Sequence, residues 1–183
     1  MNYNIVTAGV GGQGVLFLSW VLGEAALGEG FYPCIGEVHG MAQRGGTVIA
    51  TVRISDRDGL GPLIKKGDAH ALIALEPLEA ARFADMLSRD GLAVVNTYPV
   101  RIKDYPDIQT LLSVVERRCE TRSYDAFEVA KKVGGEGSAN MVLLGTLAGS
   151  KRMPIEEASM KAALRKRGNA EQNIRCFEEG LRI

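Results

Sequence analysis

Short apolar runs alternate with longer segments in which apolar and polar positions recur at helical spacing. Apolar runs that end in glycine or proline are typical of strands buried on both faces of a sheet. The pattern predicts such strands over 3–8, 31–38, 47–54, 69–75, 91–97 and 119–124. It predicts helices over 15–27, 78–87, 108–117, 126–133, 139–147, 154–166 and 169–181.

The order of these elements indicates the fold class. Strands that alternate with helices form a largely parallel sheet covered on both faces, so we expect a three-layer α/β/α, Rossmann-like domain with C-terminal helices. The neighbouring strands within 31–54 are joined by a short loop, which allows one antiparallel strand in a mixed sheet. Because neither an internal repeat nor a Pro/Ser-rich linker divides the sequence, we expect residues 1–183 to form a single domain.

Charge and cysteine content restrict the partners. The chain has 22 Lys and Arg and 22 Asp and Glu among 183 residues, and this balance gives no support for nucleic-acid binding. The apolar runs are shorter than the ~20 residues of a membrane helix, and no basic leader precedes the first strand, so we expect a cytoplasmic protein without a membrane partner. Three scattered cysteines, Cys34, Cys119 and Cys176, fit reduced thiols and no metal site.

Glycine is the unusual component of the sequence. The chain has 22 glycines among 183 residues, or about 12%, whereas ~7% is usual. Gly9, Gly11 and Gly14 match G-x-G-x-x-G between a predicted strand and a predicted helix, as phosphate-binding loops do. Gly12 and Gln13 are additional, since the dinucleotide fingerprint does not require them. Three interpretations stay open: nucleotide or phosphate binding, small residues that pack a strand against a helix, and contact with a partner's ligand.

A second glycine-rich segment spans 37–46 and reads Glu-Val-His-Gly-Met-Ala-Gln-Arg-Gly-Gly. Glu37 lies 37 − 14 = 23 positions beyond Gly14, near the place of a ribose-binding carboxylate in dinucleotide sites. The acid, imidazole, amide and guanidinium groups suit anion binding or a tight subunit contact, whereas a solvated loop is the simpler alternative. The candidates in this segment are Glu37, His39, Gln43, Arg44, Gly45 and Gly46.

Polar residues also follow two later strands, at Glu76 and Asn96. In open α/β sheets, ligands bind outside the carboxyl ends of the strands, so we expect these residues and both glycine-rich segments to converge at one edge.

Other polar residues have simpler explanations. Asp125 and Ser138 are predicted to cap helices, and Asn140 is predicted to make local capping contacts. His70 fits a core or strand-edge histidine, and Trp20 a core or interface position.

Together the two glycine-rich segments resemble those of the gamma-type subunits of the 2-oxoacid:ferredoxin oxidoreductases. The Glu-Val-His-Gly-Met-x-Gln-Arg-Gly-Gly form is most similar to the beta subunits of the indolepyruvate branch, whereas pyruvate and 2-oxoglutarate relatives usually differ there. The segments 71–77, 94–97 and 138–145 also resemble later parts of the family, so the resemblance covers almost the whole chain.

The resemblance implies a complex that oxidatively decarboxylates a 2-oxoacid, indolepyruvate or another aryl pyruvate, to an acyl-CoA and reduces ferredoxin. The resemblance implies that thiamine diphosphate, Mg²⁺ and [4Fe–4S] clusters lie in a larger partner subunit that carries the ferredoxin-type domain. The cysteine content fits this division, because three scattered thiols cannot build a four-cysteine cluster site. This chain would complete the partner's active site, with His39 and Arg44 in support, and would contribute to coenzyme A binding. The candidate cofactor-binding residues are Gly9, Gly11, Gly12, Gln13, Gly14, Glu37, Gln43, Gly45, Gly46, Glu76 and Asn96.

Several alternatives stay open at the level of sequence. The chain fits a gamma subunit of a pyruvate or 2-oxoglutarate enzyme, a free-standing NAD(P)- or flavin-dependent oxidoreductase that uses Gly9–Gly14 and Glu37, or a non-catalytic interaction module on the same fold. A homodimer of the isolated chain is a further alternative.

Overall fold

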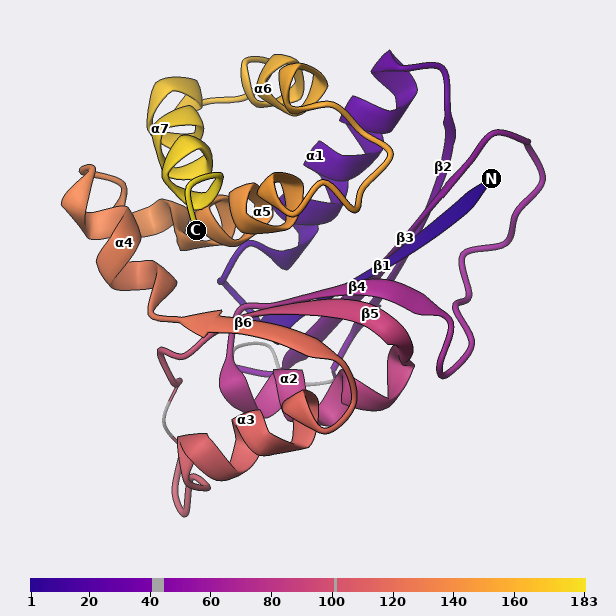
Figure 1. Ribbon diagram of the computed structural model, residues 1–183. Coiled ribbons are helices and arrows are strands. Elements are labelled where there is room, and N and C mark those ends of the chain that lie inside the picture. Colours follow the sequence, from indigo (N-terminus) through magenta and orange to yellow (C-terminus); the bar gives the residue numbers. More distant parts are fainter. Residues whose placement is uncertain (41–44, 101) are drawn as a thin grey trace.

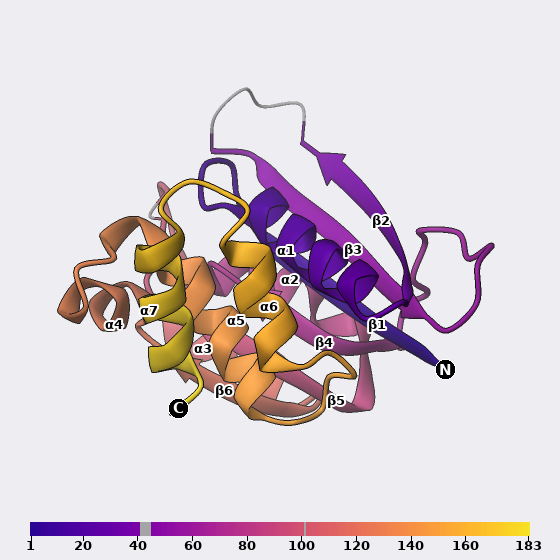
Figure 2. The same ribbon diagram turned by 90° about the horizontal axis from the view of Figure 1, so that it is seen from above.

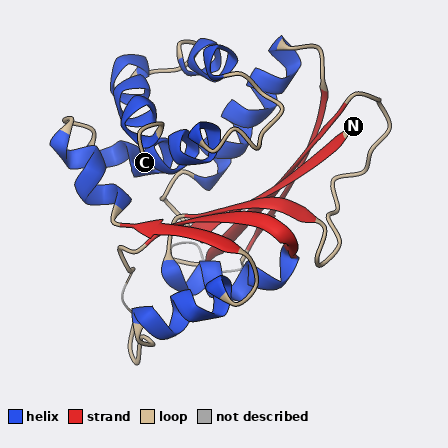
Figure 3. Cartoon of the chain, viewed as in Figure 1, coloured by secondary structure: helices blue, strands red, loops and turns tan. Residues whose placement is uncertain are grey.

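In the computed structural model, a six-stranded sheet lies between two layers of helices (Figures 1 and 3). The structure describes residues 1–40, 45–100 and 102–183. The sheet has the order β2-β3-β1-β4-β5-β6. Its strands are β1 (Asn2–Val10), β2 (Tyr32–His39), β3 (Thr47–Ser55), β4 (Ala69–Ala74), β5 (Leu87–Asn96) and β6 (Glu120–Tyr124).

The directions of the strands bring most of their carboxyl ends to one edge. β1 pairs in parallel with β4, β4 with β5, and β5 with β6. β3 lies between β1 and β2 and runs antiparallel to both, so five strands share one direction and β3 is reversed. The expectation of a mostly parallel sheet with one antiparallel strand is confirmed.

The helices divide between the two faces of the sheet, as Figures 1 and 2 show. One layer contains α1 (Val15–Gly28), α5 (Ala139–Gly149), α6 (Glu157–Leu164) and α7 (Ala170–Gly180), with α4 (Ala126–Lys132) packed against α5 and α7. The other contains α2 (Pro77–Phe83) and α3 (Ile108–Glu116). Within the described part of the chain, no helix is long and apolar enough to cross a membrane.

The side chains of β1 supply two separate apolar cores. Ile5 packs into the core under α1 and α5 together with Leu22, whereas Val6 and Ala8 pack into the core under α2 and α3 together with Leu112. All five are at most 5% exposed, and full burial of one such aliphatic side chain stabilises a fold by ~1.5–3 kcal/mol. A strand buried on both faces needs apolar residues at successive positions, which explains why β1 reads as one continuous apolar run.

Glycine also permits direct backbone contact between the helices α5 and α7. A Cβ atom added at Gly145 would lie 2.0 Å from the carbonyl oxygen of Phe177, and one added at Gly180 would lie 2.0 Å from that of Val142. The two backbones therefore touch, and part of the glycine excess serves packing far from the glycine-rich loops.

Three elements have a boundary that differs from the expectation by three residues or more. The helix predicted to reach residue 87 ends at Phe83 and continues as a 3-10 turn, Ala84–Met86. β5 starts at Leu87, earlier than predicted, because Leu87 is buried and pairs with Ala69 before a register shift in β4. The polar stretch 88–90 hides this start in the sequence. The helix predicted over 154–166 is limited to α6, 157–164.

The two predicted helix caps have different outcomes. Asp125 caps α4 as expected, since its Oδ1 accepts from the Glu128 amide at 3.0 Å. The prediction for Ser138 is wrong, because its side chain makes no capping bond to α5. Its hydroxyl instead donates to Oδ1 of Asn173 at 2.7 Å and ties the start of α5 to α7.

Candidate functional site

The glycine-rich loops lie at the point where the chain leaves two adjacent parallel strands toward opposite faces. β1 continues through Gly9–Gly14 into α1 on one face, and β4 continues through Glu76 into α2 on the other. Open α/β sheets bind ligands at such a topological switch point, outside the carboxyl ends of the strands. The geometry therefore places the candidate site between the ends of β1 and β4.

The first loop combines tight packing with an open surface. A Cβ atom at Gly9 would lie 2.9 Å from Oε1 of Gln13 and 3.0 Å from Cβ of Leu75, so glycine is needed there for space. Gly14 has φ +85° and Gly12 has φ +100°, a left-handed conformation that side chains rarely adopt. Nothing lies within 4 Å of an added Cβ at Gly12. Packing explains Gly9, whereas the loop leaves Gly12 accessible.

Gln13 and Asn96 connect three strand ends. Oε1 of Gln13 accepts from the Val10 amide at 2.7 Å, and its Nε2 donates to the Leu75 carbonyl at 3.1 Å. Nδ2 of Asn96 donates to the same carbonyl at 3.2 Å, while its Oδ1 accepts from the Ala126 amide at 2.9 Å. Both side chains hold β1, β4, β5 and α4 in place.

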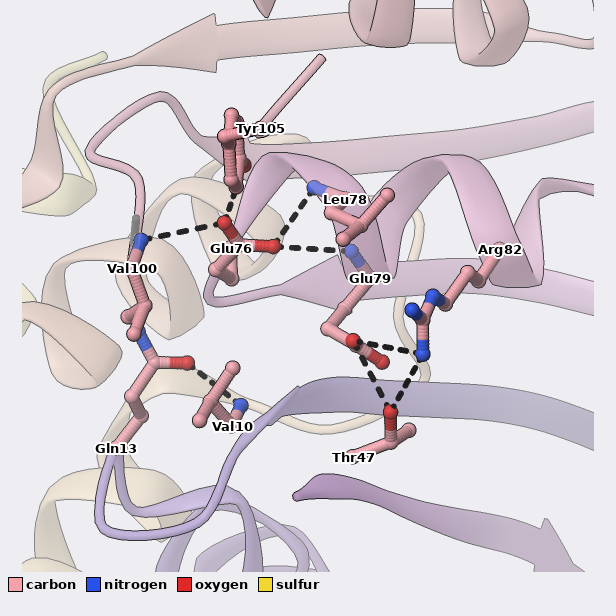
Figure 4. A network of polar contacts seen from close by, with 9 residues as sticks. All are labelled: Val10, Gln13, Thr47, Glu76, Leu78, Glu79, Arg82, Val100 and Tyr105. Carbon is pink, nitrogen blue, oxygen red and sulfur yellow. Dashed lines mark hydrogen bonds and ion pairs between the residues drawn. The ribbon is translucent and has the colours of Figure 1, made fainter. Parts of the chain in front are cut away.

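Glu76 is almost completely buried, with 1% of its surface exposed. Its Oε2 caps α2 by accepting from the amides of Leu78 at 2.7 Å and Glu79 at 3.1 Å. Its Oε1 accepts from the Val100 amide at 3.2 Å and from the hydroxyl of Tyr105 (Figure 4). The carboxylate thus fixes the segment that follows β5 over the start of α2.

The two glycine-rich segments touch through their backbones. The Gly11 amide donates to the Gly46 carbonyl at 3.0 Å. Gly45 has φ +72°, so the second segment also uses glycine for its turn. Gln43 and Arg44 lie outside the described residues, and His39 is described only as the last residue of β2.

A polar triad that the sequence interpretation missed joins this edge to α2. Thr47, the first residue of β3, donates its hydroxyl to Oε1 of Glu79 at 3.1 Å and accepts from Nη1 of Arg82 at 2.9 Å (Figure 4). Arg82 also lies 3.5 Å from the same oxygen of Glu79. Glu79 and Arg82 are three residues apart in a predicted helix, and this spacing is the sequence signal that indicates an interaction between them.

Glu79 is a buried carboxyl group with an incomplete set of partners. It is 3% exposed, and its Oε2 has no hydrogen-bond partner among the described residues. Burial raises the pKa of Glu79 because desolvation disfavours the charged form, while Thr47 and Arg82 act in the opposite direction.

Asn140 is a second residue whose role the sequence did not reveal. Its Oδ1 accepts from the adjacent Met141 amide at 3.0 Å, which fits the predicted local contact. Its Nδ2 also donates to the Gly14 carbonyl at 3.3 Å. This long-range bond holds the start of α5 against the start of α1, and no sequence period predicts it.

Three hollows of the described surface meet at Gly12. One of about 250 Å³ lies beside the stacked rings of Tyr98 and Phe127, whose centroids are 5.2 Å apart. A second, of about 300 Å³, is bounded by Leu16 and Val48. The third, of about 310 Å³, is lined by polar side chains of α5 and α7 and by Phe17 of α1. Gly12 thus lies at the centre of an accessible region with apolar and polar parts.

Glu37 lies in a different place from the ribose-binding carboxylate of a dinucleotide site. It sits inside β2 with an exposed side chain, and β3 separates β2 from β1. The dinucleotide interpretation needs this acid after the strand next to β1, so the topology removes its geometric basis. The three cysteines are free, and the described residues contain no group of three or more His, Cys, Asp or Glu placed to hold a metal ion.

The fold and the paired glycine-rich loops define a Rossmann-like chain with a composite edge built from β1, β3 and β4. The chain belongs to the pyruvate ferredoxin/flavodoxin oxidoreductase family, whose sequence model matches residues 4–183.

Individual relatives agree with this assignment. Indolepyruvate oxidoreductase subunit IorB of Methanothermobacter thermautotrophicus is 36% identical over 99% of this chain and 97% of its own length. The gamma subunit of a keto/oxoacid ferredoxin oxidoreductase from Geobacter sulfurreducens has the same fold, with a TM-score of 0.75, 24% identity and coverage of 98% of this chain and 96% of that one. A 2-oxoglutarate:ferredoxin oxidoreductase from Magnetococcus marinus, solved with 2-oxoglutarate, coenzyme A and succinyl-CoA, matches at a TM-score of 0.74 and 22% identity over 98% of this chain and 30% of that one.

Proposed function

We infer that this chain is the gamma-type subunit of a 2-oxoacid:ferredoxin oxidoreductase that acts on indolepyruvate or another aryl pyruvate. The observation that carries the proposal is the direct contact of the two glycine-rich loops, Gly11 to Gly46, at the switch point of the sheet. Full-length similarity to an indolepyruvate oxidoreductase subunit supports the aryl substrate.

The reaction converts a 2-oxoacid and coenzyme A to acyl-CoA and carbon dioxide. The bond between the carboxylate and the oxo carbon breaks, the coenzyme A sulfur bonds to that carbon, and one proton and two electrons leave. Two oxidised ferredoxins take the electrons, one each, which balances the reaction.

We propose that a larger partner subunit supplies the redox chemistry. Thiamine diphosphate, with Mg²⁺, provides the electron sink for decarboxylation, and [4Fe–4S] clusters carry the electrons to ferredoxin. The chain's three cysteines are too few for one four-cysteine cluster. A subunit of this kind works in the cytoplasm as part of its complex.

This chain's contribution is to bind and orient, at the edge where its loops meet. The first amides of α1 have no acceptor within the helix, and with the accessible Gly12 they suit the phosphates of coenzyme A. The hollow beside Tyr98 and Phe127 suits the apolar part of a thioester. Gln13, Glu76 and Asn96 act as positioning residues, because their side chains bond within the chain.

We propose that His39 and Arg44 support the partner's active site from the second loop. An arginine binds carboxylate or phosphate in a fixed geometry, which suits either a 2-oxoacid or coenzyme A. We expect His39→Ala or Arg44→Ala to lower the activity of the complex more than the stability of this chain. An equal loss of both would indicate a structural role.

Reconstitution with the partner tests the proposed function. The chain and the iron-containing partner are purified separately, and coenzyme A-dependent reduction of ferredoxin by indolepyruvate is measured for each alone and for the mixture. We expect activity only in the mixture. Tight NAD(P)H binding with turnover by this chain alone would instead support a free-standing oxidoreductase, and full activity of the partner alone would support an accessory module.

A further inference from the structure

The polar hollow between α1, α5 and α7, on one face of the sheet (Figure 2), has an uncharged lining. Its volume is about 310 Å³, at the lower end of the range of small-molecule sites. Among the described residues, no Asp, Glu, Lys, Arg or His lines it, whereas five carboxamide side chains do: Gln13, Asn140, Asn169, Gln172 and Asn173. Each carboxamide offers both donors and an acceptor, so the lining favours an uncharged group that carries donors and acceptors of its own.

Helix α7 presents three of these carboxamides on one face. Asn169 precedes Gln172 and Asn173 by three and four positions, and residues at this spacing are neighbours on a helix surface. Asn169 is exposed and makes no capping bond, and Gln172 is half-buried. The side chains of Asn169 and Gln172 form no hydrogen bond with another described residue. Both carboxamides are therefore available to a ligand.

Asn173 supplies a buried donor that lacks an acceptor. The residue is 6% exposed, and its Oδ1 accepts from the Ser138 hydroxyl at 2.7 Å, which leaves Nδ2 as the free group. Among described side chains that are not exposed, only the Tyr3 hydroxyl and Oε2 of Glu79 are both fully buried and without a partner, so Nδ2 of Asn173 retains contact with the solvent. Because donors of buried residues nearly always have a partner, this nitrogen indicates an acceptor that comes from outside the chain.

An aromatic ring borders the same hollow. Phe17, in the first turns of α1, lines it and stacks on Trp20 with ring centroids 5.9 Å apart. Aromatic rings bind nucleobases by stacking, and the carboxamides of Asn and Gln pair with the exocyclic amino group and N7 of adenine. Gly12 and Gly14 also line the hollow. A base placed here thus lies next to the start of α1, where helix amides suit phosphate groups.

We propose that this hollow binds the adenine ring of a nucleotide. The carboxamide of Gln172 accepts from the exocyclic amino group and donates to N7, Nδ2 of Asn173 donates to another ring nitrogen, and Phe17 contacts the face of the ring. Hypoxanthine fits less well, because its exocyclic oxygen and N7 both accept, whereas one carboxamide offers this pair one donor and one acceptor. Coenzyme A and free adenine nucleotides share the adenine ring, and for coenzyme A the proposal rests on the function proposed above.

The fluorescence of Trp20 provides a direct measure of binding, because Trp20 is the only tryptophan of the chain and stacks on Phe17. The purified full-length chain is titrated with AMP and with IMP, in which an oxygen replaces the exocyclic amino group. We expect AMP to bind about tenfold more tightly than IMP, as the loss of one bidentate pair predicts. Equal affinities, or the absence of a saturable change with AMP, would overturn the proposal.

Two variants assign the binding to this hollow. Gln172→Met removes a carboxamide that has no described hydrogen bond, so we expect an unchanged Tm and equal affinities for AMP and IMP. Asn173→Asp keeps the acceptor for Ser138 but replaces the free donor. We expect it to weaken the binding of adenosine, which has no phosphate for the new charge to repel. The matched control is Gln109→Met, at an exposed position of α3 on the other face of the sheet, which is expected to keep the preference for AMP. The same preference in Gln172→Met would overturn the proposal.

The reconstituted complex distinguishes the two sources of the ring. We expect a KM about tenfold higher for the hypoxanthine analogue of coenzyme A than for coenzyme A itself, and no such difference in Gln172→Met. Equal KM values for the two, together with an intact preference for AMP, would show that the hollow binds a free adenine nucleotide. Failure of this proposal leaves the proposed function standing, because that function is tested by the activity of the mixture alone.

Discussion

The hydroxyl of Thr47 donates to the buried carboxyl group of Glu79 at 3.1 Å. This bond fastens the first residue of β3, directly after the second glycine-rich loop, to helix α2. The position of that loop therefore depends on a buried acid whose pKa is raised by desolvation.

The raised pKa of Glu79 makes stability depend on pH. The folded chain holds this proton more tightly than the unfolded chain, whose carboxyl group has the ordinary value of 4.5. The stabilisation is complete below that pH and is lost as the pH rises through the folded pKa. The side chain in Glu79→Gln stays neutral at every pH. As the pH rises from 4 to 8, we therefore expect the free energy of unfolding, measured with urea, to fall less in Glu79→Gln than in the wild type.

The control for this effect is Glu128→Gln. Glu128 is more than half exposed on α4, so its replacement is expected to leave the slope of stability against pH as in the wild type. Parallel curves for Glu79→Gln and the wild type would show that burial of Glu79 does not control the slope.

The backbone contact between α5 and α7 predicts that one added methyl group lowers the stability of the fold substantially. In Gly145→Ala the new Cβ would overlap the carbonyl oxygen of Phe177, and overpacking of this kind costs ~1–3 kcal/mol or more. Gly28→Ala is the control, because nothing lies within 4 Å of the added Cβ at the end of α1 and alanine is favoured in a helix. Denaturant unfolding of both variants measures the difference, and a Gly145→Ala protein as stable as the wild type would contradict the close packing.

Gln13→Ala removes the link between the ends of β1 and β4. The partly buried Val10 amide loses its acceptor, and because the full cost of ~1–3 kcal/mol applies to a buried donor, we expect a loss near the lower end of that range. We expect both a lower free energy of unfolding and a lower activity of the reconstituted complex. Gln109→Ala, at an exposed position of α3, is expected to change neither. Wild-type stability of Gln13→Ala would remove the positioning role.

Gly12 and Gly59 form a matched pair for testing the accessible loop. Both have a left-handed backbone, with φ +100° and +89°, and both have open space around an added Cβ. Alanine at either position is therefore expected to cost a similar ~1–2 kcal/mol of stability. We expect only Gly12→Ala to weaken coenzyme A use by the complex, seen as a higher KM. The same KM change in Gly59→Ala would show that strain alone is responsible.

Much of the fold could be predicted because local patterns and tertiary structure agree. The continuous apolar run of β1 reflects burial on both faces, with Ile5 on one side and Val6 on the other. The start of β5 was missed because Leu87 is separated from the rest of the strand's buried residues by the polar stretch 88–90, and only its pairing with Ala69 makes it a strand residue.

The sequence predicts where the candidate site lies, but not which residues contact one another there. The convergence of the glycine-rich loops follows from strand direction, which the alternation of elements indicates. The bond from Asn140 to Gly14 joins residues 126 positions apart, and no local period contains such information. The comparison of Glu37 with a ribose-binding carboxylate also needs long-range information. The sequence does not reveal that β3 lies between β2 and β1 in the sheet.

The substrate preference of the reconstituted complex tests the central claim most directly. The measurement is kcat/KM for coenzyme A-dependent ferredoxin reduction with indolepyruvate, phenylpyruvate, pyruvate, 2-oxoglutarate and a branched-chain 2-oxoacid. We predict that an aryl pyruvate exceeds every non-aryl substrate by about tenfold or more, a difference of ~1.4 kcal/mol in transition-state binding. A preference for pyruvate, 2-oxoglutarate or the branched-chain acid would contradict the assignment, and activity of this chain without its partner would contradict its role as a subunit.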